Sequence, residues 1–423
     1  MPTAWFITGG STSSMTSSPQ SRASAGTQSR AHSGAQHVTF IHSSDFQLGM
    51  TRWFLDDDAQ SRFDDSRLRA IARLGDLAEE SGAEFIVVAG DVFDANALKP
   101  QTMDRALAAL DALPVPVYLL PGNHDALLPG AALERAAQRD NITVLSDSTP
   151  VEVRPGVELV GAPLLARYAT EDLAAKAIAG LEPTDTIRIL VAHGQCEDRS
   201  GENKPDRIDL PGLEAALDAG VIDYVAMGDT HSAGPIGTSG RVWFSGAPEV
   251  TDFHDHRENV EGGEVNSGKA LVVDVDKRSA EDSEVSVDER TVGEWTFDAL
   301  HFEVADSADV KELLDHLEAY PEKTRTVVKY SIAGTLGLEA TRELEEGLAA
   351  KENVFGALFE RKRLMDLHLE PSDEELANLP LTGYARDAMS SLLEMASAPA
   401  DPEGAASARD AVNLLFRLSK EPN

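Results

Sequence analysis

The sequence predicts an α/β protein with two sheets flanked by helices, followed by a smaller α/β domain and C-terminal helices. Short aliphatic runs alternate with amphipathic helical patterns, as buried strands and covering helices do. Each of five such runs ends on Gly, Asp, His or Asn, and the strand–helix pattern restarts after about Trp295. With 423 residues, of which 42% are hydrophobic, the chain is long enough for two or three packed units.

Composition limits the surroundings and partners of the chain. There are 72 acidic against 37 basic residues, a formal net charge of −35, so the overall field repels nucleic acid and anionic membranes. A nucleic-acid partner would therefore need a local basic surface or bound cations. The single cysteine excludes a disulfide scaffold and suits a reducing cytoplasm. No apolar run approaches the ~20 residues of a membrane helix, so we expect a cytoplasmic protein without a membrane partner.

The first 36 residues are dense in Ser, Gly, Ala and Gln, and this composition predicts disorder. The segment lacks the charged and apolar regions of a secretory signal, and we assign it no function.

Buried strands are predicted where aliphatic runs end in polar turns. The five runs are VTFIHSSD (38–45), AEFIVVAGD (83–91), VPVYLLPGN (115–123), TIRILVAHG (186–194) and IDYVAMGD (222–229). Amphipathic helices are predicted at 64–82 and 100–113. Runs at 157–164, 241–248 and 269–275 lack intervening helices, which indicates a second, partly antiparallel sheet, and 254–268 is interpreted as a polar loop.

The chain after Trp295 predicts a separate small α/β domain. Strands are expected at 300–304, 326–334 and 364–370, and helices at 308–320 and 339–352. Helices at 373–396 and 407–420, with a linker at 398–404, complete the chain. We therefore expect boundaries at 37–294, 295–371 and 372–423.

Polar side chains follow the five buried strands at their carboxyl ends, where α/β sheets generally place their sites. They are Asp45, Gln47, Asp91, Asn123, His124, His193, Asp229 and His231. One of these residues alone would fit a turn or a structural histidine, but five successive strands ending this way point to chemistry. Two divalent ions about 3.5–4 Å apart need a bridging carboxylate with further oxygen and imidazole ligands. The set therefore predicts a two-metal phosphoesterase centre.

The motifs make this interpretation specific. HSSDFQLG (42–49), GDVFD (90–94), PGNHD (121–125), HG (193–194) and GDTH (228–231) resemble those of the calcineurin-like metallophosphoesterases. Within that family, the HxSDxxLG opening, SGAPE (245–249) and the additional domain are most similar to SbcD-type DNA-repair exonuclease subunits, relatives of the double-strand-break repair nuclease. The resemblance covers roughly residues 38–275.

The resemblance implies a role for each motif residue. The first metal position is implied for Asp45, Gln47, Asp91 and His231, and the second for Asp91, Asn123, His193 and Asp229, with Asp91 as the bridge. His124 matches the histidine that assists phosphodiester cleavage, and we expect Asp125 to orient its ring. The resemblance implies Mn²⁺ as the metal, with Mg²⁺ as the alternative.

Two positions depart from the family pattern. The family usually has DxH where this chain has Asp45-Phe46-Gln47, and GHxH where this chain has Gly228-Asp229-Thr230-His231. An amide and a carboxylate thus replace two imidazoles. Both still offer oxygen donors, so ligation is kept while ligand strength and charge change, and loss of activity stays an alternative.

Other residues carry weaker signals. Cys196 is interpreted as a buried small hydrophobe near the site. His254 and His256 bracket Asp255 and offer metal ligands, although a solvated loop is the simpler interpretation. Arg361, Lys362 and Arg363 are the densest basic run, which fits either a solvated face or phosphate contact. The terminal helix carries an apolar stripe that packs on its own domain or binds a partner.

The resemblance implies a metal-dependent DNA exonuclease subunit that works in DNA repair with an SbcC-type coiled-coil ATPase, and in which residues 295–371 form a capping domain that guides DNA. A homodimer is compatible with it. Two other functions stay open: a DNA-binding scaffold with a weak metal centre that regulates the ATPase, which Gln47 and Asp229 favour, and a phosphodiesterase for small substrates, which the acidity of the chain allows.

Overall fold

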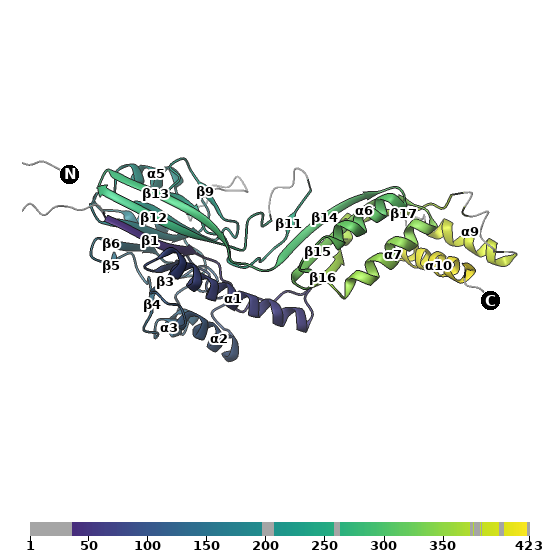
Figure 1. Cartoon of the computed structure of the whole chain (residues 1–423), viewed down its shortest axis with the longest axis horizontal. Helices are drawn as coiled ribbons and strands as arrows, with labels where there is room; N and C mark the ends of the chain where they lie inside the picture. The colour runs from purple at the N-terminus through teal and green to yellow at the C-terminus, as the bar shows by residue number, and fades with distance from the viewer. Residues whose placement is uncertain are drawn as a thin grey trace, which may run out of the picture. The chain divides into compact units, whose positions relative to one another are not determined.

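The computed structural model describes residues 36–196, 207–257, 263–372, 375, 381, 383–396 and 402–420. Residues 1–35 of the segment predicted to be disordered and residues 398–401 of the predicted linker lie outside these residues. Gln36 begins a strand and residues 402–404 begin the terminal helix, so the two predictions were wrong at these positions. The described chain confirms the α/β fold with two packed sheets, helices on their outer faces and a further α/β region toward the C-terminus (Figure 1).

The first sheet has the strand order β13-β12-β1-β2-β3-β4. Its strands are β1 (Gln36–Ser43), β2 (Ile86–Val88), β3 (Val117–Leu119), β4 (Ile142–Val144), β12 (Lys269–Ser279) and β13 (Asp282–Thr291). Strands β1 to β4 are parallel, whereas β12 runs antiparallel to β1. The expectation that 269–275 belongs to the second sheet was therefore wrong. The exposed, alternating strand β13 was not predicted, because its burial pattern leaves few apolar residues to signal it.

The second sheet has the order β5-β6-β7-β8-β10-β9. Its strands are β5 (Val151–Arg154), β6 (Val157–Ala162), β7 (Ile187–His193), β8 (Tyr224–Gly228), β9 (Gly234–Ile236) and β10 (Val242–Phe244). Strands β6, β7, β8 and β10 are parallel, and the antiparallel pairs lie at the two edges. This sheet is partly antiparallel, as predicted, but it also takes β7 and β8.

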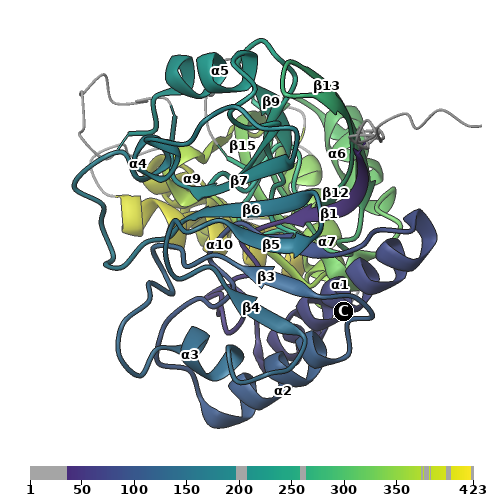
Figure 2. The ribbon, with the colours of Figure 1, turned by 90° about the vertical axis from the view of Figure 1, so that its left-hand side faces the viewer.

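Three apolar clusters hold these layers together. Figure 2 shows the strands of the two sheets between the helices of the outer layers. Ile86 and Val88 face the outer helices, whereas Phe40 and Val87 face the second sheet, as expected for side chains that alternate along strands. The helices beside the first sheet are α1 (Asp57–Ser81), α2 (Pro100–Asp111) and α3 (Ala132–Ala136), and those of the second sheet are α4 (Leu173–Ile178) and α5 (Leu210–Asp218). The strands are thus buried on both faces, which explains their continuous aliphatic runs.

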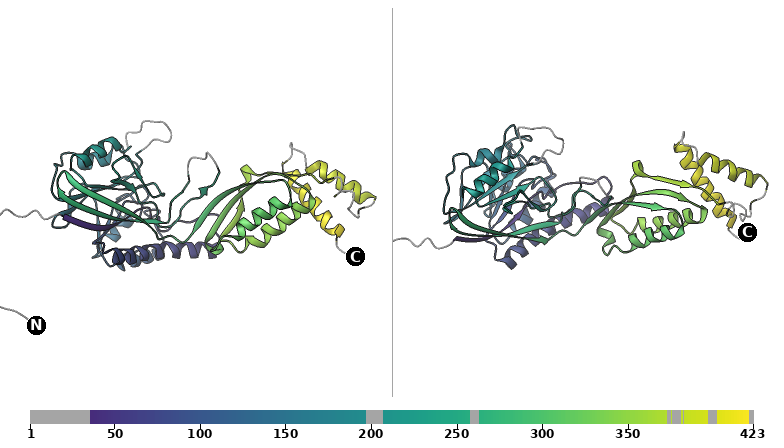
Figure 3. Two further views of the ribbon diagram at one scale, coloured as in Figure 1. Left: turned by 45° about the horizontal axis from the view of Figure 1, so that its top comes forward. Right: turned by 90° about the horizontal axis from the view of Figure 1, so that it is seen from above.

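A third sheet follows, with the order β11-β14-β15-β16 and with β17 also bonded to β15. Its strands are β11 (His254–Asp255), β14 (Thr296–Val304), β15 (Thr326–Leu336), β16 (Ala357–Glu360) and β17 (Asp366–Leu369). Helices α6 (Ser307–Glu318) and α7 (Leu338–Glu352) lie together on one side of it (Figure 3). Because β11 pairs with β14, the prediction that 254–268 is only a polar loop was wrong.

Helices α9 (Tyr384–Ala396) and α10 (Pro402–Lys420) pack against each other through Met389, Val412 and Phe416. The apolar stripe of the terminal helix therefore has a partner within the chain. In the part of the chain that the structure describes, no helix is both long and apolar enough to span a bilayer.

Candidate metal centre

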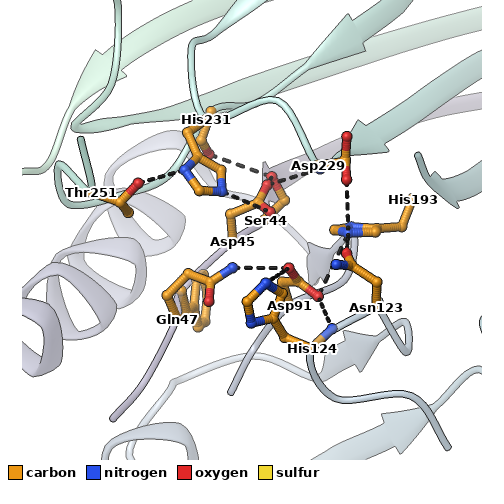
Figure 4. A network of polar contacts seen from close by, with 12 residues as sticks. Ser44, Asp45, Gln47, Asp91, Asn123, His124, His193, Asp229, His231 and Thr251 are labelled. Atoms are coloured by element: carbon orange, nitrogen blue, oxygen red, sulfur yellow. Dashed lines mark hydrogen bonds and ion pairs between the residues drawn. The ribbon is translucent and has the colours of Figure 1, made fainter. Parts of the chain in front are cut away.

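The predicted ligands meet at the carboxyl ends of strands from both sheets. Asp45 and Gln47 follow β1, Asp91 follows β2 and Asn123 follows β3 in the first sheet. His193 ends β7, while Asp229 and His231 follow β8 in the second sheet. Figure 4 shows these side chains turned toward one another, with Asp91 between Gln47 and Asn123. Parallel strands bring their carboxyl ends to one edge, so these loops are neighbours despite their separation in sequence.

The group around His193 matches the set expected for the second metal. His193 Nε2 lies 2.9 Å from Asn123 Oδ1, 3.6 Å from Asp91 Oδ1 and 3.8 Å from Asp229 Oδ1. The other ring nitrogen, Nδ1, lies 2.8 Å from the carbonyl oxygen of Ala89 and donates to it. This bond orients the ring and leaves Nε2 facing the three oxygens.

The group around Asp45 matches the set expected for the first metal. His231 Nε2 lies 3.6 Å from Asp45 Oδ1, and Gln47 Nε2 donates to Asp91 Oδ2 at 2.9 Å. Because the amide nitrogen of Gln47 donates to Asp91, the amide oxygen Oε1 points away from that carboxylate. Ligand atoms of Asp45, Asp91 and His193 all lie within 4.8 Å of one another, so the two groups form one centre.

The backbone is strained at the centre. Among the described residues, the non-glycine positions with positive φ are Asp45, Gln47, Asp91 and Asp229, with φ of 54°, 48°, 53° and 96°. Left-handed conformations cost non-glycine residues energy and cluster at functional sites. All four are predicted ligands, so the strain coincides with the centre.

Several buried oxygens at the centre have no hydrogen-bond partner. Asp45 Oδ1, Gln47 Oε1 and Asp229 Oδ2 belong to this group among the described side chains. A buried polar atom without a partner costs about 1–3 kcal/mol. Bound cations would satisfy oxygens of this kind, so the residues fit the two divalent ions that the resemblance implies.

The charges of the centre act on its histidines. Burial alone would lower the pKa of His193, but the carboxylates of Asp91, Asp45 and Asp229 outweigh it and raise this pKa to about 9. Burial likewise opposes protonation of His231, yet the bond to Glu264 and the charge of Asp45 raise its pKa to about 9. Two imidazolium ions thus balance the carboxylates in the metal-free chain, and incoming metal ions must displace their protons.

His124 lies at the mouth of the centre. Its Nδ1 lies 2.9 Å from the carbonyl oxygen of Asp94 and donates to it, while its Nε2 lies 4.0 Å from Asp91 Oδ2. The side chain is 37% exposed, so Nε2 is accessible to a substrate. The ring is therefore oriented by a backbone carbonyl and presents its second nitrogen to the cleft.

Asp125 has a different place from the expected one. Its two oxygens accept hydrogen bonds from the backbone N–H groups of Gly122 and Phe93, at 2.8 and 3.1 Å, and Asp94 supplies the contact that orients His124. Burial, reinforced by the charge of Asp91, raises the pKa of Asp125 to about 7. Asp125 thus ties together the loops that carry Asp91 and Asn123, and the expectation that it orients the ring was wrong.

Two residues of the centre were missed in the sequence. Glu264 Oε1 lies 2.9 Å from His231 Nδ1, and Thr251 Oγ1 lies 2.5 Å from the same nitrogen. Burial alone would raise the pKa of Glu264, but the bonds from His231 and Thr251 lower it. Neither residue follows a buried strand, so no motif marks them, and only the folded chain brings them to His231.

We expect Glu264→Gln to lower metal affinity at the first position by about 10–100-fold, because the partner of a ligating histidine fixes its ring. The measurement is a Mn²⁺ titration of the purified chain. Glu249→Gln is the matched control, since Glu249 is also buried but accepts bonds from the backbone of Glu294 and Trp295. Equal affinity in wild type and Glu264→Gln would contradict this role.

The weaker candidates have separate places. Cys196 is buried, as interpreted. Arg361 Nη1 donates to Asp255 Oδ2 at 2.6 Å, so an acidic neighbour already offsets its charge. Lys362 and Arg363 are exposed and form a short 3₁₀ turn after β16.

The chain belongs to the calcineurin-like phosphoesterase family, whose model matches residues 38–255, just over half of the sequence. Solved structures are similar to it at low identity. The protein TT1561 of Thermus thermophilus has 12% identity and a TM-score of 0.36, covering 59% of this chain and 99% of that one. A dimetal phosphatase from Danio rerio has 12% identity and a TM-score of 0.36, covering 59% and 98%. No curated protein matches the chain.

Family membership makes this protein a metal-dependent phosphoester hydrolase. When bound, two divalent ions polarise the phosphate and supply a nucleophile from water near neutral pH. The residues that would hold them are Asp45, Gln47, Asp91, Asn123, His193, Asp229 and His231. The chain itself contributes rigid ligand loops and an accessible imidazole at His124.

Proposed function

We propose that this hydrolase is a DNA nuclease that cleaves phosphodiester bonds in DNA repair and works with a coiled-coil ATPase. The observation that carries the choice of DNA is an exposed aromatic ring on the loop that supplies Asp45 and Gln47. Trp53, on this loop, is 84% exposed, and its ring lies 5.4 Å from that of Phe359.

The contact between Trp53 and Phe359 brings together aromatic rings, a basic run and the metal centre. Phe359 lies on β16, and the basic run Arg361–Arg363 follows that strand directly. The loop of Trp53 is anchored near the metal centre, because Arg52 donates to the carbonyl of Thr251, the residue beside His231. Nucleic-acid strands bind where bases stack on aromatic rings and phosphates meet cations. A small phosphate ester would need neither the stacking rings nor the additional cations.

The surface around Phe359 and the metal centre also supplies local positive charge in an acidic chain. With a charge of −35, the chain needs local cations to approach DNA. Lys362 and Arg363 are exposed just after the strand that carries Phe359, and two metal ions would turn the three carboxylates of the centre from −3 to a positive charge. Mn²⁺ is the proposed metal, because a set richer in oxygen than in imidazole suits harder cations.

The test compares substrates and variants together. With Mn²⁺, the purified chain should cleave linear duplex or single-stranded DNA faster than a chromogenic bis-phosphodiester. The Trp53→Ala variant should weaken DNA binding by about 1–3 kcal/mol. Replacing Lys362 and Arg363 by Ala should flatten the salt dependence of binding by roughly one unit per lost phosphate contact.

The controls are exposed residues elsewhere. Tyr384 is 87% exposed on α9, and Lys311 is exposed on α6, so Tyr384→Ala and Lys311→Ala should leave DNA binding unchanged. An unchanged salt slope in the Lys362/Arg363 variant would refute the DNA surface. DNA binding without turnover would instead indicate a scaffold, and cleavage of the small diester alone would indicate a small-molecule phosphodiesterase.

The ATPase partner is proposed from the resemblance to SbcD-type exonuclease subunits. Leu414 and Leu418 of α10 are 52% and 58% exposed, although the opposite face of this helix packs on α9. Exposed leucines one turn apart suit an apolar helical partner. Leu414→Glu combined with Leu418→Glu should abolish binding of a coiled-coil ATPase in a pull-down while leaving nuclease activity intact.

We expect Gln47→His to lower the Mn²⁺ concentration needed for activity, because the neutral amide is a weaker donor than imidazole. Histidine tolerates the positive φ of 48° at this position better than most residues, so the backbone accommodates the change. Asp229→His is the comparison, since it removes a carboxylate from the second position and should not lower that requirement. Best activity of the wild type with Zn²⁺, or an unchanged Mn²⁺ requirement in Gln47→His, would contradict this account.

A further inference from the structure

A second group of metal-ligand side chains lies outside the centre described above. Strand β11 runs parallel to β14, with His254 opposite Asp298 and Asp255 opposite Ala299. His256 directly follows β11, and its backbone N–H donates to the carbonyl of Ala299 at 3.1 Å, which continues the pairing. Residues two apart on an extended chain point to the same face of a sheet, so His254 and His256 share a face with Asp298. Asp255 lies between the two histidines and is bonded to Arg257 and Arg361 instead.

The three side chains are in contact. The ring centroids of His254 and His256 are 3.9 Å apart with a tilt of 41°, and His256 Nε2 lies 2.8 Å from Asp298 Oδ1. One ligand atom from each residue lies within 4.8 Å of the others. Ligands at about 2.1 Å from a tetrahedral zinc are about 3.4 Å apart, so small side-chain rotations bring this set to that geometry.

The carboxylate of the group is held in place. The Tyr320 hydroxyl donates to Asp298 Oδ2 at 2.5 Å, which leaves Oδ1 for the two histidines. Asp298 is only 8% exposed, so its orientation is fixed on both sides by packing and by this bond. Metal ligands with an outer hydrogen-bond partner of this kind are typical of built sites.

We propose that His254, His256 and Asp298 form a mononuclear Zn²⁺ site. Two imidazoles with one carboxylate are a set that zinc favours, whereas the oxygen-rich centre suits harder cations. A cavity of about 870 Å³ opens beside the group, lined by His256, Asp298, Tyr320 and His316 among others. The fourth zinc position is thus accessible to water or a small anionic ligand.

The ion would connect two parts of the chain. Strand β11 begins three residues after Thr251, which contacts His231, and β14 belongs to the sheet with β15 and β16. Bound zinc fixes β11 against β14 through three bonds in addition to the short strand ladder. The proposed zinc site therefore joins the segment after Thr251, next to the metal centre, to the third sheet.

The test uses the full chain, stripped of metal, dialysed with Mn²⁺ and then titrated with Zn²⁺, with bound zinc measured by elemental analysis. The wild type should hold one more zinc per chain than the His254→Asn/His256→Asn variant. Zinc that enters the two-metal centre adds equally to both proteins, so it does not change the difference in zinc content between them. His368→Asn is the matched control, because His368 is also exposed and bonded to an aspartate, Asp366, at 3.1 Å.

Two further variants keep the test decisive if the double variant does not fold. Asp298→Asn should lose the same zinc, and Tyr320→Phe should weaken its affinity by about 10–100-fold. Zinc should also raise the thermal unfolding midpoint of the wild type more than that of Asp298→Asn. Equal zinc content in the wild type, Asp298→Asn and Tyr320→Phe would overturn the proposal.

Discussion

Replacing His124 by alanine should lower turnover of the proposed substrate, DNA, by about 10²–10⁴-fold while both metal ions stay bound, the range expected for loss of a general acid. The reason is geometric. The Asp94 carbonyl holds Nδ1 at 2.9 Å, so a proton can be exchanged with the leaving oxygen only through Nε2, which faces the cleft. Elemental analysis of the variant measures the metal content, and steady-state kinetics measures the turnover.

The leaving group separates this role from a structural one. A nitrophenolate leaves without protonation, so the deficit of His124→Ala should shrink on a nitrophenyl diester compared with DNA. A deficit of the same size on both substrates, or loss of metal in the variant, would show that His124 supports the ligands and does not transfer a proton.

Gly122→Ala should reduce kcat/KM by about 10²-fold or more, although Gly122 has no side chain that could hold a metal ion. An added Cβ would lie 2.1 Å from Asp91 Oδ1 and 2.4 Å from the backbone nitrogen of Asp91. The carboxylate of Asp91, the expected bridge between the metal ions, would have to move, and a displacement of about 1 Å at a reacting centre costs about this much in rate. Metal content measured by elemental analysis should fall in parallel.

The control for this variant is Gly234→Ala. A Cβ on Gly234 meets no atom within 4 Å, and this glycine has no positive φ, so alanine should be accepted there. Full metal content and full activity in Gly122→Ala would show that Asp91 is not needed as the bridge. A loss in both glycine variants would point to unfolding rather than to the centre.

Much of the fold was predictable because the buried strands carry long aliphatic runs. Strands β1, β2, β3, β7 and β8 end close to the predicted positions, and the residues after them meet at one edge. Sheet membership was less predictable, because a run such as 269–275 has the same composition in either sheet. Only the antiparallel register of β12 with β1 decides it.

The rest of the site depends on contacts between distant residues. Glu264 contacts His231 across 33 positions, and His256 contacts Asp298 across 42. Single-strand patterns carry no information on such pairs. The role of Asp125 failed for a related reason: a side chain adjacent to His124 in sequence is turned into the loop, and a backbone carbonyl takes the place expected for it.

The left-handed backbone at Asp45, Gln47, Asp91 and Asp229 has a consequence for engineering. Each such residue costs about 1–3 kcal/mol, which the surrounding sheets must supply. Ligand spacing is therefore a property of the sandwich and is already set before any cation arrives. Transplanting the seven side chains onto another scaffold would not reproduce the centre unless the three loops that hold these four residues, and the sheets that enforce their conformations, were transplanted as well.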